Sequence, residues 1–267
     1  AKGSGTYLTT SLLEKCQADD IPVLRYACKT EFVDLPESVR ISDTNDWCKD
    51  NVLPLISKMS KDYPTYLGED FGRTGDLSVQ WPYQEMAGLK HKPPFVVELR
   101  NVPFEQQKQI LFYICDKLPR FRGGAFDARG NGQYIAEVAR QRYGKDRILE
   151  VMLTEGWYRE NMPPLKQACE DNETFIPKDG DILDDHRAIK MIKGVAKVPD
   201  IGRTKGRDGG DRHGDSAIAH CLAKHASRQL AGVGEYAYHP VKKNTRMDDD
   251  NRPVKVTAGL GRGEGLW

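Results

Sequence analysis

The sequence predicts an α/β fold in which helices cover both faces of a mixed, five-stranded sheet. Three short strand-like segments come first in the central part of the chain, so a meander is expected there. Two further strand-like segments then alternate with helical stripes, an order that favours right-handed crossovers. The chain has 267 residues, which suits one large domain or one domain with a substantial extension.

The first three strands are expected where apolar residues alternate or run together between turn-rich segments. The turn-rich sequence FGRTGD separates the first two strands, and the third reads PFVVELRNV. The three strands are predicted at residues 65–70, 77–83 and 94–102.

The later elements follow in an alternating order. A helix is predicted over residues 104–118 from the stripe that Ile110, Leu111 and Ile114 form. The fourth strand, residues 121–126, ends at Asp127. A helix at 133–143 that stops at Gly144, a fifth strand at 148–153 and helices at 158–169, 184–192 and 215–230 complete the prediction.

The two ends of the chain differ from this central part. Residues 1–64 carry no catalytic pattern, and we expect a linker or docking segment that precedes a main domain at 65–234. Residues 235–267 are polar and rich in glycine, a composition typical of a flexible tail.

Composition excludes several classes of protein. A net charge of +1 argues against a uniformly basic nucleic-acid coat but permits a local basic patch. No apolar run reaches the roughly 18 residues of a membrane span, and the first residues do not resemble a signal peptide. The six cysteines form no C-x-x-C pair, so we expect reduced core thiols in a cytoplasmic protein rather than a zinc site.

Three aspartates stand where a strand ends or a helix begins, namely Asp70, Asp127 and Asp215. Each alone has an ordinary interpretation, as a turn residue or a helix N-cap. Strands one and four of the expected sheet can lie side by side, so Asp70 and Asp127 would end adjacent parallel strands at one edge. Buried carboxylates are costly to bring together unless cations hold them, which favours a divalent-metal site.

The residues around Asp215 add to this pattern. His213 precedes it by two positions and could ligate a metal, orient Asp215 or transfer a proton. Asp211 is the alternative third carboxylate. Residues 193–212 form a basic, Gly-rich loop or hairpin that we expect to bind DNA phosphates. The candidate DNA-binding residues are Lys197, Arg203, Lys205, Arg207 and Arg212.

Together the three aspartates suit a site for two divalent ions, Mg²⁺ or Mn²⁺, about 4 Å apart. Such ions would activate a water and stabilise the leaving oxygen of a phosphodiester. We expect Asp70 to bridge both ions, with Asp127 and Asp215 each holding one.

Three segments carry a family resemblance: GEDFGRTGDLSVQWP, FDARGNGQYIAEVA and RTKGRDGGDRHGDSAIAHCLA. They resemble the nuclease domain of large terminase subunits from Mu-like phages and prophages, over residues 65–230. The H-x-D motif at His213 and Asp215 is the most specific part. The resemblance implies a ribonuclease H-like fold and a metal-dependent DNA endonuclease, with the acidic metal ligands at Asp70, Asp127 and Asp215.

The same resemblance implies partners and a setting. Double-stranded DNA, a phage portal, a small terminase subunit and the ATPase portion of the same protein would be the partners, in the cytoplasm of the bacterial host. No G-x-x-x-x-G-K-[ST] phosphate loop occurs in this sequence, so translocation is not assigned to it.

Three alternatives stay open at this point. DFGRT at residues 70–74 satisfies the D-x-G-x-T phosphate loop of actin-like and sugar-kinase phosphotransferases, although no convincing second phosphate loop follows. A resolvase or transposase of the same fold is the second alternative. A non-catalytic DNA-binding or portal-docking module is the third.

Overall fold

The computed structural model describes residues 5–72, 77–199 and 202–232, and every structural statement below concerns these residues. The expected tail at residues 235–267 lies outside them, as do Arg73 and Thr74 of the DFGRT segment. No helix in the described ranges combines the length and apolar character needed to cross a bilayer.

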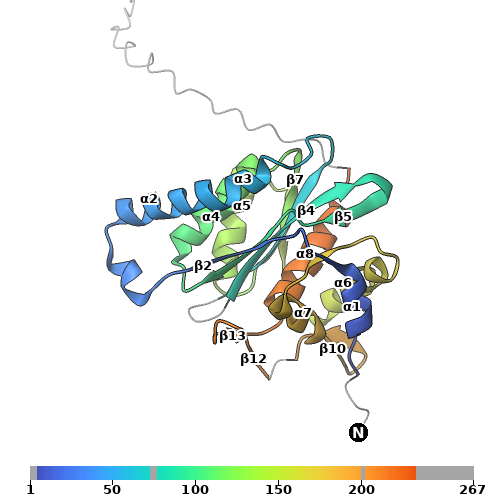
Figure 1. The fold of residues 1–267 in the computed structure, drawn as a ribbon. Coiled ribbons are helices and arrows are strands. Elements are labelled where there is room, and N and C mark those ends of the chain that lie inside the picture. The colour runs from blue at the N-terminus through green and yellow to red at the C-terminus, as the bar shows by residue number, and fades with distance from the viewer. Residues whose placement is uncertain (1–4, 73–76, 200–201, 233–267) are drawn as a thin grey trace, which may run out of the picture. The chain divides into compact units, whose positions relative to one another are not determined.

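A mixed sheet forms the centre of the fold (Figure 1). Its strand order is β2-β6-β4-β3-β7-β8, with β5 paired to β4. The strands are β2 (Val23–Ala27), β3 (Thr65–Asp70), β4 (Leu77–Met86), β5 (Lys90–Lys92), β6 (Val96–Arg100), β7 (Phe121–Asp127) and β8 (Ile148–Val151). Strand β4 runs antiparallel to β3 and β6, whereas β3, β7 and β8 are parallel neighbours.

The predicted fold class is confirmed by this topology. The five expected strands occupy the order β6-β4-β3-β7-β8, a meander followed by two crossovers, which is the ribonuclease H-like arrangement. The described sheet has seven strands rather than the expected five. The short strand β5 pairs antiparallel with the end of β4, and β2 pairs in parallel with β6 at the edge of the sheet.

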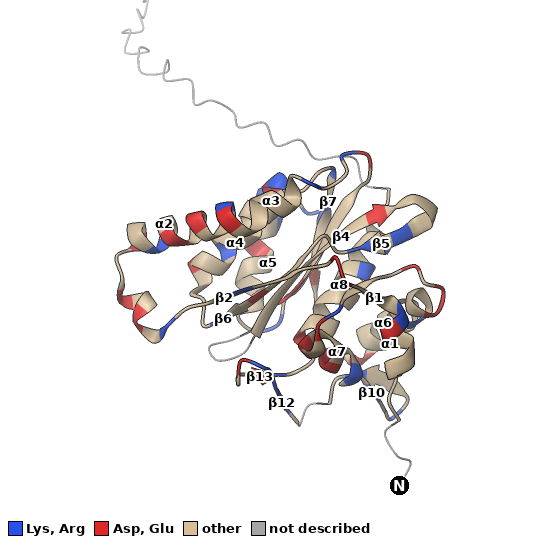
Figure 2. Ribbon diagram, in the orientation of Figure 1, with Lys and Arg blue, Asp and Glu red and all other residues tan. Residues whose placement is uncertain are grey.

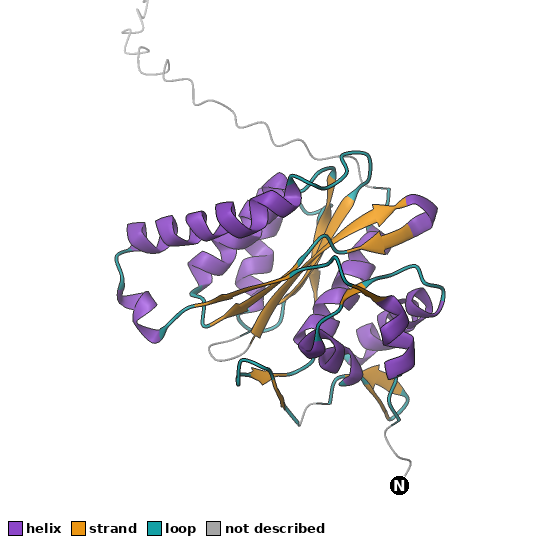
Figure 3. Ribbon diagram, in the orientation of Figure 1, coloured by secondary structure: helices purple, strands orange, loops and turns teal. Residues whose placement is uncertain are grey.

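Helices cover both faces of the sheet (Figure 3). Buried side chains divide into two clusters, one on each face. One cluster includes residues of α1 (Thr10–Cys16), α6 (Glu155–Glu170), α7 (Gly180–Arg187) and α8 (Asp215–Gln229). The other includes residues of α3 (Leu53–Ile56), α4 (Phe104–Lys117) and α5 (Gly132–Tyr143), with Trp47 of α2 (Glu37–Trp47) packed against it.

Short elements complete the description. The π-helical segment Cys48–Val52 joins α2 to α3, and single 3-10 turns span Thr30–Asp34 and Ala87–Leu89. Three strand pairs lie outside the main sheet: β1 (Gln17–Ala18) with β9 (Ile176–Pro177), β10 (Lys190–Ile192) with β11 (Val195–Lys197), and β12 (Thr204–Lys205) with β13 (Asp211–Arg212).

The helix predicted at residues 184–192 is wrong in its boundaries. Helix α7 begins earlier because Asp179 caps it, accepting hydrogen bonds from the main-chain N–H groups of Asp181 and Ile182. It ends at Arg187, and the chain then forms the β10–β11 hairpin. Lys193 and Gly194 adopt positive φ angles of 50° and 82° at the turn of that hairpin, which a helix cannot accommodate.

Residues 1–64 contribute to the sheet through β2, whose Val23 pairs with Val96 of β6. The division of the chain at residue 64 stays a prediction. All six cysteines are buried and none forms a disulfide, as expected for core thiols. The expected cytoplasmic location stays a prediction.

A close approach between α8 and β3 positions the site. Gly68 lies in the middle of β3, and a methyl group there would overlap main-chain atoms of Ala219 and Ala223 in α8. The helix therefore lies directly on the strand, and only glycine permits this distance. Asp70 is two residues after Gly68 and Asp215 is one helical turn before Ala219, so both lie at the same end of this contact.

Candidate metal centre

The structure brings Asp70, Asp127 and Asp215 together at one edge of the sheet. Glu69 of β3 is in register with Phe126 of the parallel strand β7, so the residues that follow them end the two strands side by side. Asp215 reaches the same edge as the first residue of α8. The three aspartates are 6%, 5% and 8% exposed, and the charges of Asp127 and Asp215 act on Asp70.

These three carboxylates are buried close to one another, so their negative charges repel. Burial raises the pKa of Asp70 well above its usual range, and the charges of Asp215 and Asp127 raise it further. Burial also raises the pKa of Asp215 to about 7, with a contribution from Asp185 of α7. A divalent cation bound among the three groups would favour the charged forms of Asp70 and Asp215 and reverse this effect.

Arg129 supplies a positive charge to one of these aspartates. Both oxygens of Asp127 accept hydrogen bonds from it: Oδ1 from the main-chain N–H and from Nε, each at 3.0 Å, and Oδ2 from Nη2 at 3.0 Å. The carboxylate of Asp70 makes no hydrogen bond or ion pair within the described part of the chain. The site is therefore short of positive charge.

The donor set fits Mg²⁺ or Mn²⁺, because these ions prefer carboxylate oxygens and three carboxylates meet here. In the conformation present, no three His, Cys, Asp or Glu side chains of the described residues are grouped closely enough to hold an ion. Since both oxygens of Asp127 are bonded to Arg129, a metal shared by all three aspartates would compete with these bonds.

His213 lies next to this site. Its main-chain N–H donates to Oδ2 of Asp215 at 2.9 Å. Its ring Nδ1 is buried and has no hydrogen-bond partner among the described residues. The three roles expected for this histidine stay predictions, and the unpartnered nitrogen is available for metal binding or for a proton.

The predicted basic loop contains the β12–β13 hairpin, on which Figure 2 colours the basic residues blue. Four of its five candidate residues are at least partly exposed. Lys205 pairs with Asp211 at 2.6 Å, and Arg203 lies 3.9 Å from the same carboxylate. Arg207 is exposed and donates its main-chain N–H to Asp181. The Lys197 ammonium pairs with Glu155 at 3.1 Å, and its side chain is 12% exposed.

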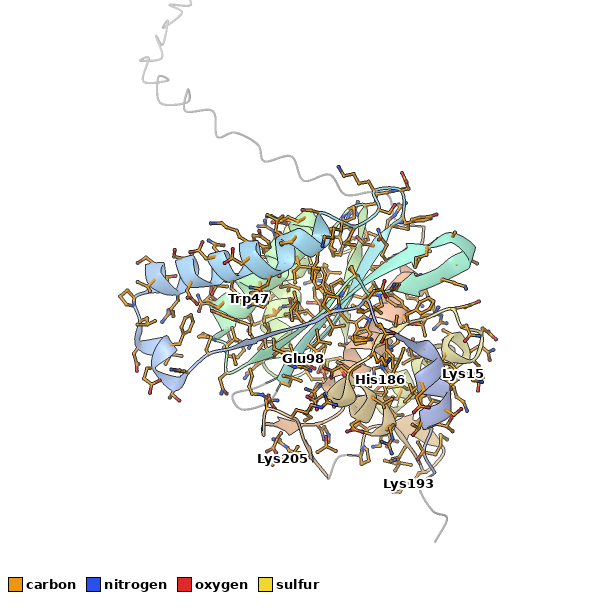
Figure 4. The ribbon with its side chains drawn as sticks, viewed as in Figure 1. Lys15, Trp47, Glu98, His186, Lys193 and Lys205 are labelled. Atoms are coloured by element: carbon orange, nitrogen blue, oxygen red, sulfur yellow. The ribbon has the colours of Figure 1, made fainter. Side chains whose placement is uncertain are left out.

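Arg212 differs from the others and corrects one expectation. Its side chain is 2% exposed and pairs with Glu98 of β6 at 2.6 Å and with Asp185 of α7 at 2.7 Å. Figure 4 marks Glu98 on the sheet beside the helical layer. Because both partners are themselves buried, this guanidinium joins sheet to helix and is not available to DNA phosphates.

The sequence analysis missed Asp185. This fully buried carboxylate accepts hydrogen bonds from the main-chain N–H of Ser216 at 3.1 Å and from its hydroxyl at 2.7 Å. It thereby caps the start of α8, where Gly214, with φ 73°, has no side chain to do so. A weak sequence signal existed, because Asp185 lies three residues after Ile182 and four before Ile189, on the apolar face that Asp184 does not share.

Arg129 was also missed, although a signal for it exists. A strand-ending aspartate followed two residues later by a main-chain donor is a common turn, and here the residue two positions on is an arginine. The segment FDARG therefore contained both partners of the pair.

The known proteins that this chain resembles in sequence come from phage Mu and a Mu-like prophage. The chain is 45% identical over 229 residues to the probable terminase, large subunit gp28, of Escherichia phage Mu, covering 85% of this chain and 41% of that protein. It is 37% identical over 247 residues to the Mu-like prophage FluMu protein gp28 of Haemophilus influenzae, covering 92% of this chain and 48% of that protein. No protein-family model matches. The resemblance predicted from the sequence is confirmed, and the chain spans less than half the length of these curated relatives.

Among solved structures, the large terminase of bacteriophage HK97 is similar to this chain with a TM-score of 0.52 and 10% identity. The likeness covers 84% of this chain and 44% of that one, and it shows a shared fold.

Proposed function

We propose that this chain, which over most of its length resembles part of the large terminase subunits of Mu-like phages, is a metal-dependent DNA endonuclease that cuts phage DNA during genome packaging. One observation carries the proposal. Three buried aspartates meet at the carboxyl edge of a ribonuclease H-like sheet, and Arg129 pairs with just one of them.

The three aspartates would hold two Mg²⁺ or Mn²⁺ ions, with Asp70 shared between both and with Asp127 and Asp215 holding one each. Ions bound there would supply an activated water and neutralise the leaving oxygen of the phosphodiester. Burial of the carboxylates limits competition from bulk water for the ions. His213, with its unpartnered Nδ1, would accept or donate a proton beside Asp215.

DNA binding is assigned to the exposed part of the basic loop. Arg203, Lys205 and Arg207 would contact phosphates on either side of the cleavage position, and Lys197 would extend this surface. Such contacts carry no sequence information, so the expected substrate is double-stranded DNA of any sequence, bound with salt-dependent affinity.

The proposed partners follow from the resemblance to large terminase subunits, and the curated relatives are more than twice as long as the part this chain matches. An ATPase portion of the same protein, a phage portal and a small terminase subunit would deliver the DNA. The reaction would take place in the cytoplasm of the bacterial host.

Digestion of a supercoiled plasmid tests the proposal. The parent chain should nick and linearise the plasmid with Mg²⁺ or Mn²⁺ and not with a chelator, and Asp127→Asn should be inactive. Asp184→Asn, which changes an exposed aspartate of α7, is the matched control and should cleave like the parent.

Other outcomes point elsewhere. Cleavage that persists in the chelator, or full activity in Asp127→Asn, would contradict the proposed site. ATP hydrolysis without DNA cleavage would favour the phosphotransferase alternative. A strong preference for branched DNA would favour a resolvase.

A further inference from the structure

We propose that Arg129 is a resident counter-ion of the three-aspartate site, and that it exchanges Asp127 for a phosphate of the DNA when a divalent ion binds. This inference rests on the proposed function and adds a residue to it. It assigns two successive partners to one side chain, a carboxylate in the metal-free protein and a phosphate in the loaded complex.

The first partner is visible in the structure. The Nε and Nη2 of Arg129 face the two oxygens of Asp127 at 3.0 to 3.2 Å, the parallel fork that a guanidinium makes with a carboxylate. A third bond from the main-chain N–H of Arg129 fixes the carboxylate in this orientation. Asp127 therefore points its oxygens to Arg129 rather than to a shared ion.

The solvent exposure of the two side chains indicates that Arg129, rather than Asp127, is able to move. The side chain of Asp127 is 5% exposed, whereas that of Arg129 is 46% exposed. The guanidinium thus covers the carboxylate from the solvent side, and it can leave without opening the core. Asp127 cannot move comparably, because it ends β7 and pairs in register with Val151 of β8.

Repulsion between two cations favours the exchange of partners by Arg129. A divalent cation bound to Asp127 and a guanidinium bonded to the same two oxygens repel each other at short range. Asp70 and Asp215 supply the remaining negative charge, and Arg129 already lies within electrostatic reach of Asp70. Arg129 would therefore leave Asp127 when a divalent ion binds, and its place in the chain would keep it at the site.

The second partner follows from where the displaced side chain remains. Arg129 is tethered two residues from Asp127, and Gly130, with a φ of 55°, turns the chain directly after it. A guanidinium held beside a metal site meets the phosphate that approaches the metal, and its planar fork fits phosphate oxygens as it fits a carboxylate.

Titration calorimetry with Mn²⁺ and no DNA tests the first step. Arg129→Gln should bind Mn²⁺ about fivefold more tightly than the parent, the factor that a half-exposed ion pair of ordinary strength represents. Arg140→Gln is the matched control, because Arg140 is 45% exposed and pairs with Glu150 at 3.3 Å. Its Mn²⁺ affinity should equal that of the parent.

Single-turnover cleavage at saturating Mn²⁺ tests the second step. Arg129→Gln should cleave about a hundredfold more slowly than the parent, since a donor to the transferring phosphate is removed. Arg129→Lys keeps the charge without the fork and should fall between the two. Tighter metal binding with slower cleavage in one variant is a combination that simple damage to the fold does not produce.

The results of these two experiments distinguish a failure of the Arg129 exchange from a failure of the proposed nuclease function. If the parent binds no Mn²⁺, or if Asp70→Asn binds it equally well, the proposed function fails. If the parent binds and cleaves but Arg129→Gln matches it in affinity or in cleavage rate, the exchange is overturned and the proposed nuclease stands.

Discussion

Two groups of buried acids lie near the start of α8, and they are neutralised differently. Around Arg212, each carboxylate has a partner supplied by the chain: Glu98 and Asp185 share its guanidinium, and Arg25 also pairs with Glu98 at 2.9 Å. We call this group the paired cluster. Its components come from the sheet, from α7 and from the basic loop, so it joins three parts of the fold.

The group of Asp70, Asp127 and Asp215 has a deficit instead, because Arg129 pairs with one of the three carboxylates. The difference shows that buried carboxylates in one fold can have two different roles. Acids matched by internal arginines hold the architecture, whereas acids left short of positive charge form a place for a cation from solution.

The largest expected effect concerns Asp70, Asp127 and Asp215, which we call the unmatched group. A substitution there should change activity but not stability. Asp70→Asn should reduce the single-turnover cleavage rate at least about a thousandfold. The free energy of unfolding in a chelator, measured with urea, should not fall, because the substitution removes a repelling charge. A strongly destabilised but active variant would erase the distinction between the two groups.

The paired cluster should respond in the opposite way. Arg212→Met leaves Glu98 and Asp185 buried without their shared cation, and it should lower the free energy of unfolding by about 3 to 5 kcal/mol. Arg187→Met, which removes a guanidinium paired on the surface of α7, is the control and should change stability little. A decrease below about 1 kcal/mol for Arg212→Met would show that the cluster contributes little to stability.

Metal ions should stabilise the chain through the unmatched group alone. At a free Mg²⁺ concentration about 100 times its Kd, the free energy of unfolding should rise by about 2.7 kcal/mol, and a chelator should reverse the change. Asp215→Asn should lack most of this stabilisation, whereas Asp184→Asn should keep it. Equal stabilisation of both variants would place the bound ion elsewhere.

Helices α7 and α8 also meet through two buried histidines, which predicts a smaller, pH-dependent effect on the free energy of unfolding. His186 Nε2 lies 3.0 Å from His220 Nδ1, and burial lowers the pKa of both rings. The unfolded chain then binds more protons than the folded one below about pH 6.5, so stability should fall by about 1 to 2 kcal/mol as the pH drops from 7.5 to 5.5.

Urea unfolding at a series of pH values measures this change. His186→Asn should be less stable than the parent at neutral pH, because it removes the hydrogen bonds to His220 and to the Ile182 carbonyl. Its stability should depend less on pH over the same interval. An unchanged pH dependence would mean that other groups account for the acid sensitivity.

The smallest expected effect concerns the basic hairpin. Asp211 pairs with Lys205 and so competes with DNA for it. Asp211→Asn should strengthen DNA binding about threefold, since an exposed ion pair is weak and its loss frees Lys205. Replacement of Arg203, Lys205 and Arg207 by Ala should weaken binding and reduce the slope of log K against log salt by about 1 for each phosphate that is no longer bound. An unchanged slope would contradict their proposed role.

The central sheet and the meeting of its acids could be predicted from the sequence because they follow local signals and one topological rule. The periodicity around Asp70 and Asp127 identified two strands, and parallel neighbours end at the same edge. The role of Arg212 could not be predicted, because its partners Glu98 and Asp185 are distant in the sequence and nothing in the basic loop marks it as buried. The pairing of β2 with β6 is likewise a long-range contact without a local signature.

The absence of a side chain at Gly68 has a consequence for how this protein can diversify. A larger residue at position 68 would overlap main-chain atoms of α8 and push this helix away from β3, which would change the separation of Asp70 and Asp215. A substitution away from the carboxylates can therefore alter ion binding, and Gly68→Ala should lower Mn²⁺ affinity even though position 68 supplies no ligand.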